Sequence, residues 1–82
     1  MSMKTETTLA RMSSGQSGII VNIHGGYGLI NRLSALGIIK GKRVAKVSDM
    51  IMRGPVTVEV GQTRIAMGHG MAGKVMVEID SP

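Results

Sequence analysis

The chain has 82 residues, of which 43% are hydrophobic, and its formal net charge is +5. This length accommodates one hydrophobic core, and therefore one domain. The absence of cysteine excludes a disulfide framework, a thiolate metal site and a cysteine nucleophile. No apolar run approaches the roughly 20 residues of a membrane-spanning helix, and the first residues lack the apolar segment of a signal peptide. We therefore expect a cytoplasmic protein without membrane insertion.

The N-terminal part of the chain is polar and precedes a first strand. Residues 1–7 are expected to form a disordered tail. Thr7 or Thr8 can cap a short helical turn over residues 9–12, with Leu9 and Met12 three positions apart. Alternation of apolar and polar residues then predicts a strand over residues 18–24.

One internal helix is predicted in the segment 25–37, which begins and ends with glycine. Leu29, Ile30, Leu33 and Leu36 recur at spacings of three and four, so they fall on one stripe that we expect to be buried. Gly37 can supply the positive φ that a helix C-terminus commonly needs. The rest of the chain must form a sheet that covers this stripe.

The remaining predicted elements are strands at residues 43–50, 56–60, 63–67 and 74–79. Broken alternation in residues 43–50 predicts a bulge, and Gly61-Gln62 predicts a two-residue hairpin turn. The glycine-rich residues 68–73 predict a turn or a single helical turn. Together the elements predict a mainly β, five- to six-stranded SH3-like barrel with one helix inserted after the first strand, and short helical turns near the N-terminus and before the last strand. An OB-fold is the alternative, disfavoured because its helix lies between the third and fourth strands.

The sequence offers no catalytic arrangement. No two of its five acidic residues stand at a spacing that forces a shared site, and no nucleophile is ordered against a base. The glycines at 25–28 match neither the Rossmann nor the Walker A spacing. His24 and His69 are the only histidines, and Met67 and Met71 flank His69, so a metal site there stays open. We expect no enzyme activity and no cofactor.

A basic cluster suggests a second function class. A phosphate-tracking patch would look like this cluster, but Tyr27 is the only aromatic side chain for base stacking, so any nucleic-acid binding would be electrostatic and without sequence specificity. The cluster consists of Lys40, Lys42, Arg43 and Lys46, with Arg32 and Arg53 as neighbours.

Several segments resemble the ferrous iron transport protein A (FeoA) family. They span residues 9–79, and the most specific is Arg32-Leu33-Ser34-Ala35-Leu36-Gly37-Ile38-Ile39-Lys40-Gly41. Others are residues 15–18, 54–60, 65–72 and 75–77. A similar module ends the diphtheria-toxin-repressor-type iron regulators. The resemblance implies one SH3-like FeoA domain over residues 8–80.

The resemblance also implies a non-enzymatic accessory protein of ferrous iron uptake. Its expected partner is the membrane transporter FeoB, bound through the cytoplasmic G-domain region. The alternatives are a nucleic-acid-binding small barrel and direct metal binding through His24 or His69, and weak self-association stays open.

Two groups of residues are candidates for the partner contact. Tyr27, Asn31 and Arg32 lie on the outer face of the predicted helix. The second group, Met50, Ile51 and Met52, is a run of three apolar residues at a predicted hairpin tip. By strand parity, either at least one of these is exposed as part of a contact surface, or Met50 and Met52 face inward with only Ile51 exposed.

Overall fold

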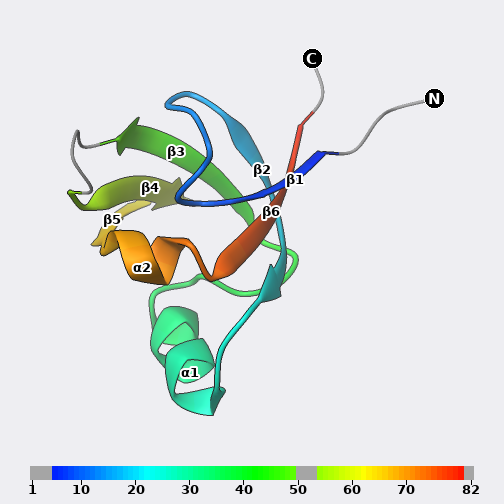
Figure 1. The fold of residues 1–82 in the computed structure, drawn as a ribbon, viewed down its shortest axis with the longest axis vertical. Helices are drawn as coiled ribbons and strands as arrows, with labels where there is room; N and C mark the ends of the chain where they lie inside the picture. Colours follow the sequence, from blue (N-terminus) through cyan, green and yellow to red (C-terminus); the bar gives the residue numbers. More distant parts are fainter. Residues whose placement is uncertain (1–4, 50–53, 81–82) are drawn as a thin grey trace.

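The computed structural model describes residues 5–49 and 54–80. This part folds into a curved, six-stranded antiparallel sheet with the strand order β1-β6-β2-β3-β4-β5 (Figure 1). The elements are β1 (Thr5–Thr8), β2 (Ser17–Ile23), α1 (Tyr27–Ala35), β3 (Arg43–Asp49), β4 (Val56–Val60), β5 (Thr63–Met67), α2 (His69–Ala72) and β6 (Val75–Ile79). The predicted strands, the helix and the helical turn before the last strand are therefore present within a residue or two of their expected bounds.

Residues 5–7 belong to a strand, and residues 1–4, the rest of the predicted tail, lie outside the described residues. Thr5 to Thr8 form β1, which pairs antiparallel with β6 from Thr5–Ile79 to Thr8–Met76. Threonine favours extended backbone because of its branched Cβ, and β6 offers an edge whose backbone groups need partners. The disordered tail expected over residues 1–7 is thus wrong for residues 5–7, and α1 follows the second strand of the sheet rather than the first.

A single hydrogen-bonded turn follows β1, as predicted. The carbonyl oxygen of Thr8 accepts hydrogen bonds from the N–H groups of Arg11 and Met12, both at 3.0 Å. The hydroxyl of Thr8 also accepts from the Arg11 N–H at 3.2 Å. This turn directs Leu9 and Met12, both buried, into the barrel.

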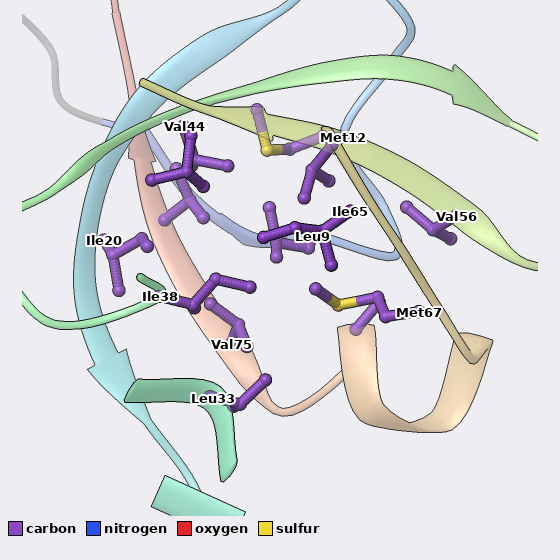
Figure 2. Close-up of a cluster of buried hydrophobic side chains, with 14 residues drawn as sticks. Leu9, Met12, Ile20, Leu33, Ile38, Val44, Val56, Ile65, Met67 and Val75 are labelled. Carbon is purple, nitrogen blue, oxygen red and sulfur yellow. The ribbon is translucent and has the colours of Figure 1, made fainter. Parts of the chain in front are cut away.

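The core is built from aliphatic side chains and methionine, with contributions from all strands except β1 (Figure 2). Its members are Leu9, Met12, Ile20, Leu33, Ile38, Val44, Val56, Val58, Val60, Ile65, Met67, Ala72, Val75 and Val77. Curvature comes from two bulges, the predicted one in β3 between Lys46 and Ser48 and another in β2 between Ile20 and Asn22. Bulges increase local twist, so a small sheet can close around such a core.

Helix α1 ends in a glycine turn that carries the chain back to the barrel. Gly37 has φ +89°, its N–H bonds to the Ser34 carbonyl (2.9 Å) and the Ile38 N–H bonds to the Leu33 carbonyl (2.9 Å). These two bonds define a Schellman motif, which confirms the predicted role of Gly37. Ile38, immediately after the motif, is fully buried.

The predicted buried stripe of α1 is only partly buried. Leu33 is the buried residue of the helix, and Leu29 packs against the core from its edge. Ile30 is half-buried, and Leu36 is 43% exposed. The expectation for Leu36 is wrong because the chain reverses at Gly37, so that Ile38 rather than Leu36 enters the core.

Candidate functional site

Helix α1 projects from one end of the barrel, opposite the end where β1 begins and β6 ends (Figure 1). Three large hydrophobic side chains are exposed in the part of the chain that the structure describes, and all belong to this helix or to the turn after it. They are Tyr27 (85% exposed), Leu36 (43%) and Ile39 (39%). Since the other large apolar side chains of the described chain are at least partly covered, this end of the molecule is the strongest candidate for a contact surface.

The three residues predicted for the outer face of α1 are all at the surface, and one of them, Asn31, faces the groove described below. Tyr27 and Asn31 are four positions apart and so lie on the same side of the helix, Arg32 lies about 100° further around the axis, and all three are exposed. The helix begins at Tyr27 after Gly26, which has no side chain to cap the first turn. The structure thus places these side chains at the surface, and their role in partner binding stays a prediction.

A groove runs between α1 and the barrel. We call it the α1 groove; its volume is about 390 Å³, and its lining consists of Asn22, Ile23, Ile30, Asn31, Ser34, Ile39 and Lys40. The far wall is held by two backbone bonds between β2 and the turn at residues 39–42. The Gly41 N–H donates to the Ile20 carbonyl at 2.8 Å, and the Ile20 N–H donates to the Lys42 carbonyl at 2.9 Å.

Sequence reasoning located the helix face but missed the groove. The signal that pointed to it is the pair Ile38-Ile39 directly after the helix. Two adjacent residues in an extended chain point in opposite directions, so only one of them can enter the core. Ile38 is buried, while Ile39 is partly exposed and lines the groove.

One member of the predicted basic cluster is buried and another is paired with an acidic residue. Lys46 is 1% exposed, and its Nζ donates to the carbonyl oxygens of Leu9 (2.5 Å), Ala10 (3.2 Å) and Met12 (2.8 Å). Arg43 forms an ion pair with Asp80. The cluster thus loses Lys46 to the interior, while Lys40, Lys42 and Arg43 stay exposed and Arg53 lies outside the described residues.

The two histidines do not share a site. His69 lines a second, open cavity of about 530 Å³ beside β1, together with Arg11 and Lys74, whereas His24 lines neither this cavity nor the α1 groove. Met67 belongs to the core, so its sulfur is not presented at the surface with His69. Within residues 5–49 and 54–80, no three His, Asp or Glu side chains gather as metal ligands.

Two further findings concern the described residues as a whole. None of their helices is long and apolar enough to cross a membrane. The ion pairs Arg43–Asp80 and Arg64–Glu59 are exposed and link strands or strand ends, so both are surface contacts of the scaffold. Met50, Ile51 and Met52, the second predicted contact group, lie outside the described residues.

Comparison with known proteins assigns the chain to a family. The FeoA domain model matches residues 7–79. This chain belongs to the FeoA domain family. Fe(2+) transport protein A of Methanocaldococcus jannaschii is 34% identical over 70 residues, which cover 85% of this chain and 83% of that protein. A protein of the same name from Campylobacter jejuni is 29% identical over 88% of this chain and 97% of its own length.

Solved structures of FeoA proteins share the fold. A crystal structure of an iron uptake regulatory protein (FeoA) superposes with a TM-score of 0.84 at 36% identity, and covers 92% of this chain and 97% of that one. FeoA of Stenotrophomonas maltophilia, solved in complex with zinc, superposes with a TM-score of 0.74 at 29% identity, and the match covers 87% of this chain and 88% of that one. The S. maltophilia protein is described as a prokaryotic SH3 domain protein. The predicted SH3-like fold is therefore confirmed, and the OB-fold alternative is not needed.

Family membership gives this chain a place in ferrous iron transport, as an accessory protein of the Feo system. The resemblance to the FeoA family is thus confirmed over nearly the range on which it was based.

Proposed function

We propose that this chain is a non-enzymatic, cytoplasmic accessory protein that binds the ferrous iron transporter FeoB on its cytoplasmic side and modulates it. The observation that carries the proposal is the position of the large hydrophobic side chains that are exposed among the described residues, all at α1 and the turn after it. Arg32 lies on the same helix and is exposed. An exposed aromatic residue and an arginine beside apolar side chains are the residue types that dominate binding energy at protein interfaces.

The rest of the described molecule fits a binding module. The curved sheet surrounds a continuous core, and its surface ion pairs belong to the scaffold. The S. maltophilia relative is proposed to act as a ferrous iron transport activating factor, which is the kind of role that we infer here.

Titration calorimetry with the soluble cytoplasmic region of FeoB from the same organism tests the proposal. We expect saturable binding by the wild-type chain, and binding weakened about tenfold or more by Tyr27→Ser combined with Arg32→Ser, since each removes an interface side chain. The matched control is Arg11→Ser, which removes an exposed arginine beside the other cavity and should leave the affinity unchanged.

The proposed function also predicts an effect on ferrous iron uptake in cells. Deleting the gene should lower ferrous iron uptake by cells that contain FeoB. If the purified proteins do not bind, and uptake is unchanged in the deletion strain, the proposed function is wrong.

A further inference from the structure

The α1 groove combines an apolar floor with a positively charged side. Ile23, Ile30 and Ile39 supply the apolar part of its lining, and Asn31 and Lys40 supply polar groups that can orient a ligand. Such a mixture of apolar side chains and convergent polar groups is typical of a site that takes a side chain from a partner. A volume of about 390 Å³ exceeds that of a single large aliphatic side chain.

The charged residues of the segment that forms the groove are all basic. The sequence contains no Asp or Glu between positions 7 and 48, whereas Arg32, Lys40 and Lys42 lie on α1 or in the turn that follows, and all three are exposed. The carboxylates of Asp80 and Glu59 pair with other cations, on the strands of the barrel. The positive charge beside the groove is therefore not neutralised by acidic neighbours from its own segment.

We infer that the α1 groove binds a short acidic segment of a partner protein and takes one large aliphatic side chain of that segment into its apolar floor. The inference rests on the proposed function and specifies the chemistry of the partner's contact. Carboxylates that flank the inserted side chain pair with Lys40, which lines the groove, and this attraction steers association and fixes the direction of the bound segment.

An anionic membrane surface is the competing occupant, since basic and apolar residues also favour lipid headgroups. The arrangement around α1 argues against it. Tyr27 and Leu36 are nine positions apart, which places them about 180° apart around the helix axis, so a flat surface cannot contact both. A hollow between helix and barrel instead fits a protruding side chain.

Selection from a phage-displayed library of random peptides tests the inference independently of FeoB. We expect the enriched sequences to carry Asp or Glu on both sides of Leu, Ile or Met. The binding of the enriched peptides, measured by fluorescence anisotropy, should weaken at least about tenfold in Lys40→Glu and in Ser34→Met, which fills the groove without removing a core contact. Lys74→Glu makes the same charge change beside the other cavity and should bind like the wild type.

The possible results distinguish an acidic peptide segment from an anionic membrane surface as the ligand of the groove. Failure to enrich peptides, enrichment of basic or uncharged peptides, or equal binding by the Ser34→Met variant overturns the inference. Co-sedimentation with phosphatidylglycerol vesicles that is lost in Lys40→Glu would assign the surface to membrane and also overturns it. If the cytoplasmic region of FeoB binds the wild type and Ser34→Met equally well, the groove inference fails while the proposed function holds. If FeoB binds neither variant, the proposed function fails, and the peptide selection alone decides whether the groove binds acidic segments.

Discussion

Lys46 is a buried cation that organises the N-terminal segment of the chain. Its ammonium group donates hydrogen bonds to three carbonyl oxygens of residues 9–12. Those carbonyls belong to a turn that carries Leu9 and Met12 into the core. Because buried carbonyls need donors, a long flexible cation on β3 satisfies three of them at once and ties β3 to the segment after β1.

Replacing Lys46 by Met tests this role. The Met side chain retains the aliphatic length but removes the donors, which leaves buried carbonyls without a partner, so we expect the free energy of unfolding to fall by about 2–4 kcal/mol. Urea denaturation followed by circular dichroism measures the change. Lys42→Met, at an exposed lysine in the turn before β3, serves as the control and should change stability by less than about 0.5 kcal/mol. Equal stability of the two variants would contradict the role assigned to Lys46.

Gly18 stands where β2 and β6 approach closely. A Cβ at this position would lie 2.2 Å from the carbonyl oxygen of Glu78, a backbone atom that cannot move without breaking the strand pairing. We expect Gly18→Ala to lower the free energy of unfolding by about 2–3 kcal/mol, as overpacking in a core does.

Gly28 provides the matched comparison. It lies within α1, and a Cβ there meets no atom within 4 Å. Alanine is the better helix former, so Gly28→Ala should raise the stability by about 0.5–1 kcal/mol. Thermal denaturation of both variants measures the two changes. If Gly18→Ala raises the stability as Gly28→Ala does, the close approach of β2 and β6 is contradicted.

At the scale of the element, α1 is attached to the barrel chiefly through Leu33, its buried side chain. Figure 2 shows Leu33 at the edge of the core cluster nearest to α1. The other side chains of the predicted stripe are partly or largely exposed. The helix therefore has one firm anchor and, beyond it, surface that is available to a partner.

Truncating this anchor should destabilise the protein far more than truncating its neighbour. Leu33→Ala removes a fully buried side chain and is expected to cost about 2–5 kcal/mol. Leu36→Ala removes a side chain that is 43% exposed, and we expect a loss below about 1 kcal/mol. Urea denaturation gives both values. A loss at Leu36 as large as that at Leu33 would mean that the stripe is buried after all.

The sequence allowed most elements to be predicted because their patterns are local. Val56, Val58 and Val60 alternate with polar residues, and the broken alternation of residues 43–50 corresponds to the bulge after Lys46. The features that escaped prediction depend on distant parts of the chain. Strand β1 forms only because β6 offers an edge, and Lys46 is buried only because residues 9–12 surround it with carbonyls.

The candidate site, like the fold, could be predicted only in part. The exposed positions of Tyr27, Asn31 and Arg32 follow from helical periodicity. The groove beside them does not, because it needs the turn at residues 39–42 to be held against Ile20 by long-range backbone bonds. The contact proposed at Met50, Ile51 and Met52 lies outside the described residues and stays a prediction.

At the scale of the whole molecule, the barrel separates its two ends. Helix α1 with its groove lies at one end, and Figure 1 shows the start of β1 and the end of β6 at the opposite end. The second cavity, beside β1 and α2, offers a basic surface of its own with Arg11 and Lys74. Of these two places, only the α1 end also exposes large hydrophobic side chains, and we therefore assign the partner contact to it.

A salt titration distinguishes the kind of contact made there. Because Lys40 and Arg32 are exposed, their attraction to acidic partner groups is screened by salt. We expect the association rate with the cytoplasmic region of FeoB to fall at least about tenfold between low and high ionic strength, while the dissociation rate, set by the apolar contacts, changes little. Surface plasmon resonance measures both rates, and an association rate independent of salt would rule out electrostatic steering by these cations.

The most direct test of the central claim is an NMR titration of the isotope-labelled chain with the soluble cytoplasmic region of FeoB. Docking at the α1 end predicts that the amide signals of residues 22–23 and 27–40 shift or broaden, while those around Arg11, His69 and Lys74 stay in place. Changes confined to the cavity beside β1, with the signals of α1 unmoved, would contradict it.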